Sequence, residues 1–313
     1  MRYDTHYKQG QKVSFKKYDL TIAALLFLPK TFDAQKKYPA IVVTHPGGGV
    51  KEQCSSLYAW HLSQAGYIAL AFDASHQGES EGLPRLLEDP FSRVEDIRSA
   101  VDYLMTLSYV DETKIAAMGV CAGAGYTMSA VQTDIRIKAA CGISTWDVGD
   151  SAKNGFPGVH IENFQQKLLE EVAKARTSEI RGGEAAYWKY VPDSPQEIDE
   201  NTSVIQKEAF EYYRTERCQY PTSVNRYLVS SNDKLAAFDA FAHLDTVSPR
   251  PILLIVGSLA DTIYFSDAAF AKAKQPKELY RIEGATHVDL YDNPVFVAAV
   301  VEKLLSFFGQ YLG

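Results

Sequence analysis

Lys114-Ile-Ala-Ala-Met-Gly-Val-Cys-Ala-Gly123 is the stretch that decides the fold. Its first half, residues 114–118, is a short apolar run typical of a buried strand, and residues 122–131 have the composition of a helix. Between them lies G-x-C-x-G, centred on Cys121. A strand, a tight turn and a helix in this order predict a strained backbone at Cys121 and a side chain that projects from the turn. Side chains at Gly119 and Gly123 would collide with the neighbouring strand and helix, so glycine is needed at both positions.

Cys121 is therefore the candidate nucleophile. The dipole of the following helix favours a thiolate at its amino end, and the free backbone N–H of Ala122 would face an oxyanion. We interpret the other three cysteines, Cys54, Cys141 and Cys218, as small buried hydrophobic residues. No two of the four form a CxxC pair, and the chain is too long for them to make a disulfide framework.

A dinucleotide-binding turn is the alternative interpretation of this stretch, because glycines also stand at positions 119, 123 and 125 after a strand. Such turns usually follow the first strand of their fold, whereas three predicted strands precede this one. The chain also lacks a Tyr-x-x-x-Lys pair of the kind that short-chain dehydrogenases use. We therefore favour the nucleophile.

Apolar runs of strand length recur on both sides of the elbow, at residues 40–45, 67–73, 137–143, 251–256 and 278–282. Helix-length amphipathic segments separate most of them, which is typical of a parallel sheet covered by helices on both faces. Near the start, an alternating segment with a turn at Tyr18–Asp19 predicts an antiparallel hairpin. The expected fold class is α/β, with a mostly parallel eight-stranded sheet.

This alternation stops between residues 145 and 249, where the pattern predicts helices at 163–175, 203–215 and 234–244. We predict a catalytic domain of residues 1–144 and 250–313, and a helical cap or lid insertion of residues 145–249. The cap is expected over the carboxyl ends of the strands, where open α/β sheets bind ligands. A helical domain without a role in the site is the alternative. Aromatic residues are frequent in the insertion, and Trp146, directly after a strand end, is the candidate pocket wall.

A nucleophile needs a base, and the base needs an orienting group. Asp261 follows the predicted strand 251–256, and His287 follows the predicted strand 278–282. The order nucleophile, acid, histidine along the chain, each after a strand end, is that of an α/β-hydrolase triad. Asp267 and Asp289 are rival acids, and Asp289 is also placed to stabilise the loop of His287.

The glycine-rich segment 47–49 follows the strand at 40–45 and predicts the rest of an oxyanion hole. Gly47, with Gly48 in reserve, would donate a backbone N–H beside that of Ala122. His45, at the end of that strand, is expected to be structural. His76 is also more typical of a structural residue, but it remains a substrate-contact candidate together with Arg85, for which a surface ion pair is the alternative.

These motifs resemble the α/β-hydrolase superfamily and, within it, the dienelactone hydrolase family. The resemblance covers most of the chain and rests on His-Pro-Gly-Gly-Gly-Val-Lys-Glu at 45–52, Ala-Phe-Asp-Ala-Ser-His-Gln-Gly-Glu-Ser at 71–80, Gly-Val-Cys-Ala-Gly at 119–123, and the segments 257–261 and 284–287. The stretches 84–90 and 285–292 are similar to those of a capped subgroup.

The resemblance implies hydrolysis of an ester, lactone or thioester by a Cys121–His287–Asp261 triad, through an acyl-enzyme and without a cofactor. Dienelactone hydrolases proper carry a glutamate in the oxyanion loop, whereas no carboxylate lies between Thr44 and Lys51 here. They also lack a cap of this size, so their small cyclic substrate is not carried over. Acyl transfer, C–C bond cleavage or cyclisation on the same fold are alternatives, ahead of a non-catalytic receptor or an oxidoreductase.

Composition restricts the partners. The 313 residues carry 39 acidic and 32 basic side chains, a net charge of −7, which disfavours binding to nucleic acid. There is no HExxH or Cys/His metal motif, and neither a signal-peptide core nor a long apolar run is evident. We expect a cytoplasmic enzyme that acts on a small acyl substrate without metal or membrane, with a homo-oligomer left open.

Overall fold

The computed structural model of the chain describes residues 7, 9–155, 161–200 and 202–313. An eight-stranded sheet lies at its centre, with the order β1-β2-β4-β3-β5-β6-β9-β10. The strands are β1 (Gln11–Lys17), β2 (Leu20–Phe27), β3 (Tyr38–Thr44), β4 (Ile68–Phe72), β5 (Val110–Val120), β6 (Ile137–Ile143), β9 (Ile252–Gly257) and β10 (Lys277–Ile282). The predicted number of strands is therefore confirmed.

The strand directions also agree with the prediction. β1 and β2 form an antiparallel hairpin around Tyr18, and β2 pairs antiparallel with β4. The other neighbours, β4-β3, β3-β5, β5-β6, β6-β9 and β9-β10, are parallel. The carboxyl ends of six parallel strands therefore meet at one edge, and the loops after β3, β5, β9 and β10 carry the candidate site residues.

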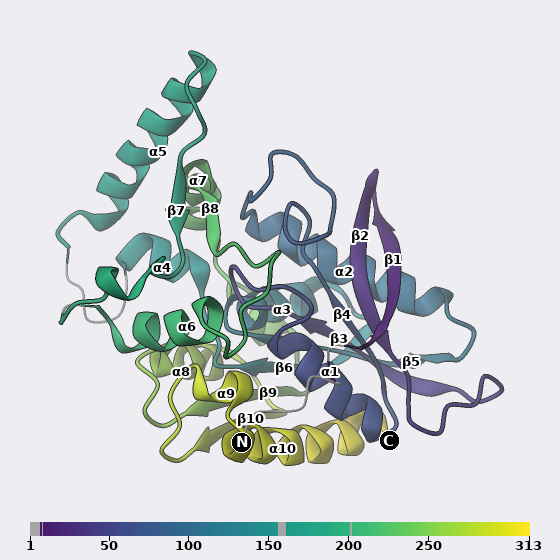
Figure 1. Cartoon of the computed structure of the whole chain (residues 1–313). Helices are drawn as coiled ribbons and strands as arrows, with labels where there is room; N and C mark the ends of the chain where they lie inside the picture. The colour runs from purple at the N-terminus through teal and green to yellow at the C-terminus, as the bar shows by residue number, and fades with distance from the viewer. Residues whose placement is uncertain (1–6, 8, 156–160, 201) are drawn as a thin grey trace.

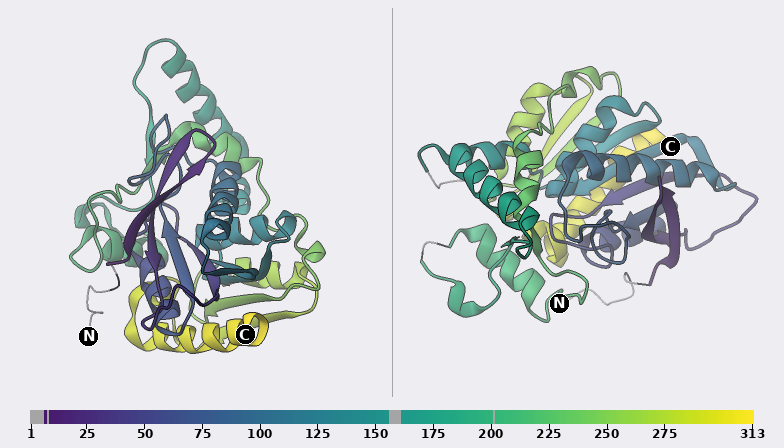
Figure 2. Two further views of the ribbon diagram at one scale, coloured as in Figure 1. Left: turned by 90° about the vertical axis from the view of Figure 1, so that its right-hand side faces the viewer. Right: turned by 90° about the horizontal axis from the view of Figure 1, so that it is seen from above.

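Helices cover both faces of this sheet, because successive residues of a buried strand point to opposite sides. Ile41 and Val43 of β3 pack with α1 (Cys54–Gln64) and α10 (Pro294–Leu312), whereas Ala40 and Val42 pack with α2 (Pro90–Thr106), α3 (Ala122–Thr133) and α8 (Ile263–Lys272). The two layers are seen in Figure 1 and from other directions in Figure 2, with α10 at the bottom of Figure 1 and of the left-hand view of Figure 2.

Helix α10 is the one helix in the described part of the chain that is long and apolar enough to cross a membrane, with a mean hydropathy of 1.5. Its apolar residues do not all face outward. Val297, Val300, Leu304 and Phe308 are buried against the sheet. A helix that packs on a sheet must bury one apolar face, and this packing explains the high hydropathy of α10.

The insert, residues 145–249, contains α4 (Val148–Asn154), α5 (Phe164–Ile180), α6 (Val204–Arg214) and α7 (Asn232–Ala236). It also contains a two-stranded antiparallel sheet of β7 (Tyr187–Lys189) and β8 (Arg226–Leu228), which the sequence pattern did not predict. Strands of three residues are too short to show alternation. Helix α5 extends farthest from the central sheet and projects at the top of Figure 1.

The helix predicted over residues 234–244 is wrong beyond Ala236, where α7 ends. The side chain of Asp239 accepts a hydrogen bond from the backbone N–H of Phe241 at 2.9 Å, a local turn that competes with helix. Phe241 and Leu244 are instead buried in the core that contains α3.

Candidate active site

The turn between β5 and α3 has the strained geometry that the sequence predicts. Cys121 has φ +57° and ψ −125°, in the region that side-chain-bearing residues avoid. A Cβ at position 119 would lie 2.1 Å from the carbonyl oxygen of Gly123, and one at position 123 would lie 2.5 Å from the carbonyl oxygen of His45. Glycine at both positions is therefore a steric requirement of the turn.

The Cys121 thiol faces two backbone donors. The N–H groups of Ala122 and Gly47 both interact with it, as does the hydroxyl of Tyr291. Cys121 is partly exposed, whereas the other three cysteines are buried, as predicted. Gly48 turns away from this centre: its carbonyl accepts hydrogen bonds from Ser223 Oγ at 2.8 Å and from Asn225 Nδ2 at 3.0 Å. The N–H groups of Gly47 and Ala122 thus converge on the Cys121 sulfur.

Burial changes the expected ionisation of the nucleophile. Desolvation raises the pKa of Cys121 to about 11, although its hydrogen bonds with Tyr291 and with the N–H groups of Ala122 and Gly47 act in the opposite direction. The helix dipole alone suggested a thiolate, but removal of the sulfur from water is the larger effect. At neutral pH the candidate nucleophile is therefore a thiol.

His287 is buried, with a neutral hydroxyl on each side of its ring. Nδ1 lies 2.5 Å from Thr262 Oγ1, and Nε2 lies 3.2 Å from the Tyr291 hydroxyl. Desolvation lowers its pKa to about 3, so the imidazole is neutral at pH 7. With its proton on Nδ1 and Thr262 as acceptor, Nε2 is unprotonated and accepts a hydrogen bond from the Tyr291 hydroxyl.

The predicted hydrogen bond between Asp261 and His287 is not formed. Asp261 Oδ2 accepts instead from the backbone N–H of Ile205, at 3.3 Å, in the first turn of α6. The next residue, Thr262, is fully buried and occupies the place beside His287. Adjacent residues of a turn point in different directions, so Asp261 and Thr262 cannot both face His287. Thr262 faces the imidazole, and Asp261 faces α6. A hydroxyl therefore replaces the expected carboxylate.

The rival acids do not take this place either. Asp289 Oδ2 accepts from the backbone N–H and the hydroxyl of Thr286, at 3.1 and 3.0 Å, which stabilises the loop of His287 as predicted. Asp267 forms an exposed ion pair with Arg281. Among the described residues, the hydrogen-bond partners of the imidazole are Thr262 and Tyr291.

A buried polar chain holds the oxyanion loop. His45 Nδ1 donates to the carbonyl of Pro46 at 2.7 Å, and its Nε2 accepts from the backbone N–H of Ala74 at 3.1 Å. Arg93 donates to the carbonyl and to Nε2 of His45, at 2.9 and 3.0 Å, and lies 3.5 Å from Glu88. Desolvation and the nearby Arg93 hold the pKa of His45 well below its usual range. His45 is structural, as predicted, and it positions the turn that presents Gly47.

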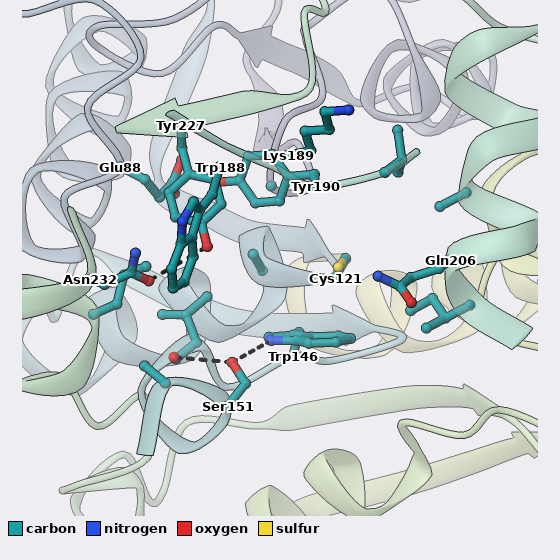
Figure 3. A pocket seen from close by; sticks show the side chains of 18 of the residues that line it. Glu88, Cys121, Trp146, Ser151, Trp188, Lys189, Tyr190, Gln206, Tyr227 and Asn232 are labelled. Atoms are coloured by element: carbon teal, nitrogen blue, oxygen red, sulfur yellow. Dashed lines mark hydrogen bonds between the residues drawn. The ribbon is translucent and has the colours of Figure 1, made fainter. Parts of the chain in front are cut away.

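The thiol opens into a cavity of about 410 Å³ between the sheet edge and the insert. Most lining side chains are aromatic or aliphatic, and they come from α4, α5, α6 and β7 as well as from the core. In Figure 3, Cys121 lies between Gln206 of α6 and a group at the far side that includes Trp188, Glu88 and Asn232. Such a cavity suits a mainly apolar ligand with few polar contacts.

Of the three proposed substrate contacts, only Trp146 lines this cavity. Its ring lies edge-on to His287, with 6.0 Å between ring centroids, and its Nε1 donates to Ser151 Oγ at 2.9 Å. His76 Nδ1 instead lies 3.1 Å from the carbonyl of Pro84. Arg85 donates to the carbonyls of Ser80 and, at 2.8 Å, Gly78, and so stabilises its own loop. Both lie outside the cavity because the loop after β4 folds back on itself.

Comparison with known proteins places the chain in a family. The family model for dienelactone hydrolases matches residues 22–144. The chain is also 40% identical to the uncharacterized protein YcjY of Escherichia coli over 307 residues, which cover 97% of this chain and 99% of that protein. The chain belongs to the dienelactone hydrolase family.

Two further comparisons concern fold and activity within this α/β-hydrolase group. The crystal structure of hypothetical protein PA2218 from Pseudomonas aeruginosa has a TM-score of 0.89 and 33% identity, and the match covers 96% of this chain and 93% of that one. A thiohydrolase of Eupenicillium brefeldianum is 26% identical over 90% of this chain and 88% of its own length. Other relatives are named acyltransferase, from Aspergillus calidoustus, and polyketide transferase, from Penicillium.

Four residues of this dienelactone hydrolase family site escaped the sequence reasoning. Thr262 directly follows the residue chosen as acid, and Tyr291 lies four positions after His287. A spacing of four residues near a short helix, α9 (Asp289–Asp292), is a weak signal for proximity to the histidine. No role was assigned to Glu88 or Arg93 from the sequence. The packing of α2 brings Arg93 to the carbonyl of His45, and Glu88 lies beside Arg93.

Proposed function

We propose that this protein hydrolyses esters or thioesters of apolar acyl groups through a Cys121 acyl-enzyme. The observation that carries the proposal is the convergence of the Gly47 and Ala122 N–H groups on the Cys121 sulfur, at the mouth of an apolar cavity. Two backbone donors aimed at the reacting position stabilise the negative charge of a tetrahedral intermediate. No cofactor takes part in this reaction scheme.

In this mechanism, the thiol proton passes to Nε2 of His287 while sulfur attacks the carbonyl carbon. The carbonyl oxygen becomes the oxyanion held by Gly47 and Ala122, and Thr262 accepts a hydrogen bond from Nδ1–H. The intermediate collapses as the leaving group departs with the proton of His287. A water then attacks the acyl-enzyme with His287 as base, which releases the acid and restores the thiol.

The ionisation of the site favours activated substrates. Proton transfer from a thiol with a pKa of about 11 to an imidazole with a pKa of about 3 is unfavourable as a separate step. We therefore expect it to occur together with the attack of sulfur on the carbonyl carbon, not before it. Leaving groups of low basicity, such as thiolates and phenolates, depart with little help from a protonated histidine. We therefore rank thioesters and aryl esters above alkyl esters, and all of these above amides.

Transfer of the acyl group to a nucleophile other than water is the second candidate. Relatives named acyltransferase and polyketide transferase support it. So does the apolar lining of the cavity, because exclusion of water protects an acyl-enzyme from hydrolysis.

A substrate panel tests both candidates. Acyl-thioesters, aryl esters and lactones of graded chain length are assayed with wild type and Cys121→Ala, with and without added alcohol or thiol acceptors. We expect turnover by wild type only, and a mass increase by one acyl group on the peptide that contains Cys121. Full activity in Cys121→Ala would reject the nucleophile. If most of the acyl group goes to the added alcohol or thiol even at a low concentration of that acceptor, acyl transfer is favoured over hydrolysis.

A further inference from the structure

Tyr291 lies between the two groups that must exchange a proton. Its hydroxyl is 3.2 Å from Nε2 of His287 and also interacts with the Cys121 thiol. The hydrogen bonds of His287 in the described structure go to Tyr291 and Thr262, and none goes directly to Cys121. In the free protein, therefore, the contact between nucleophile and base passes through a phenol.

The ring of Tyr291 is held in this position by its surroundings. It is 3% exposed and packs edge-on against Tyr212, with 5.2 Å between ring centroids, and its centroid lies 5.6 Å from that of His287. It belongs to α9, directly after the histidine loop, and it lines the cavity beside Cys121. A side chain held between the rings of Tyr212 and His287, with its one polar atom directed at the reacting groups, is suited to more than filling space.

We propose that the Tyr291 hydroxyl is a catalytic proton relay between the Cys121 thiol and Nε2 of His287. This inference rests on the proposed function and adds a residue to it. As sulfur attacks the carbonyl, the S–H bond breaks and its proton moves to the phenol oxygen, while the phenol proton moves to Nε2. The phenol is restored and one proton has reached His287. The reverse transfers bring that proton back to the leaving group.

A neutral phenol suits this role chemically. Tyrosine hydroxyl both donates and accepts hydrogen bonds. Burial, with Cys121 and Tyr213 close by, keeps the pKa of Tyr291 well above its usual range, so it remains protonated at neutral pH. A permanently protonated phenol can pass a proton on without storing charge in an apolar cavity, where an unpaired ion is costly.

The test is the pH dependence of kcat/KM for an aryl ester or acyl-thioester in Tyr291→Phe between pH 6.5 and 10. Wild type should be nearly flat, because the relay removes the thiol proton without hydroxide. The variant should be about 100-fold slower at pH 7 and should recover by about tenfold per pH unit, since hydroxide then has to deprotonate the thiol. A loss that is the same at every pH, or no loss, would overturn the relay.

Two further variants separate the hydroxyl from the packing. Tyr212→Phe is the matched control, because Tyr212 is buried against Tyr291 but does not line the cavity, and it should keep the pH profile of wild type. Site-specific 3,5-difluorotyrosine at position 291 retains a hydroxyl and should restore kcat/KM at pH 7 to within about threefold of wild type. If it is as slow as Tyr291→Phe, the hydroxyl is not the relay.

The relay and the proposed function fail in different ways. An inactive Cys121→Ala beside a fully active Tyr291→Phe would reject the relay and leave the thiol mechanism intact. If Cys121→Ala itself retains activity, the proposed function fails, and the relay fails with it.

Discussion

The candidate catalytic centre has one side formed by backbone groups and another formed by side chains. On the first side, Cys121 sits in a strained turn, and the N–H groups of Gly47 and Ala122 converge on its sulfur. On the second, His287 is held between the hydroxyls of Thr262 and Tyr291. The backbone side follows from glycine positions and strand ends, and it matches the sequence prediction. The side-chain side depends on which neighbour reaches the imidazole, and there the predicted carboxylate is displaced by a hydroxyl.

The largest effect is expected on the backbone side, at Gly123. A Cβ there would lie 2.5 Å from the carbonyl oxygen of His45, and backbone cannot yield as a flexible side chain does. Gly123→Ala should lose about 3 kcal/mol of unfolding free energy together with detectable turnover. Urea denaturation and the ester assay measure both. Gly309→Ala in α10 is the control, since its added methyl meets only Tyr67 Oη at 4.0 Å. Equal stability of the two variants would contradict the steric account of the elbow.

On the side-chain side, Thr262→Val and Asp261→Asn compare the observed orienting residue with the predicted one. Thr262→Val removes the hydroxyl 2.5 Å from Nδ1 of His287 and should reduce kcat/KM about 100-fold, because the imidazole loses its tautomer and orientation. Asp261→Asn keeps an acceptor for the Ile205 N–H and should stay within about threefold of wild type. The reverse ranking would restore Asp261 as the acid.

The ionisation of Cys121 depends on both sides of the site, because its thiol contacts the backbone donors and the Tyr291 hydroxyl. Because desolvation raises the pKa of Cys121 to about 11, alkylation by iodoacetamide, which requires a preformed thiolate, should accelerate about tenfold per pH unit between pH 7 and 10. Peptide mapping identifies Cys121 as the modified residue, and Cys121→Ala supplies the background rate. A plateau at neutral pH would instead show a stable thiolate paired with a charged histidine.

The smallest expected effect concerns stability in acid. Desolvation lowers the pKa of His287 to about 3 in the folded protein, against about 6.5 for an unfolded histidine. The unfolded state therefore binds the proton first, and stability present above pH 6.5 is lost as the pH falls toward 3. His287→Asn should reduce this loss by up to about 1.4 kcal/mol per pH unit below pH 6. Urea midpoints at pH 7, 6 and 5 give the two slopes, and parallel slopes would mean that His287 titrates normally.

Much of the fold could be predicted because it depends on local patterns. Six apolar runs and the alternating segment near the start predicted all eight sheet strands, and β6 begins and ends at the predicted residues, 137 and 143. The insert was less predictable. β7 and β8 have three residues each and form only by pairing with one another. The helix expected over 234–244 ends before the turn at Asp239. Elements whose stability comes from a distant partner leave little trace in their own residues.

The sequence by itself determined the position of the candidate nucleophile, the need for glycine around it, and the loops in which a candidate acid and base had to be sought. Those features follow from sterics and from the edge where parallel strands end. Only the tertiary structure decided that Thr262 meets His287 while Asp261 turns to α6, and that Tyr291 stands beside Cys121. Side-chain direction in a loop changes from one residue to the next, so it is set by packing and hydrogen bonds across the fold.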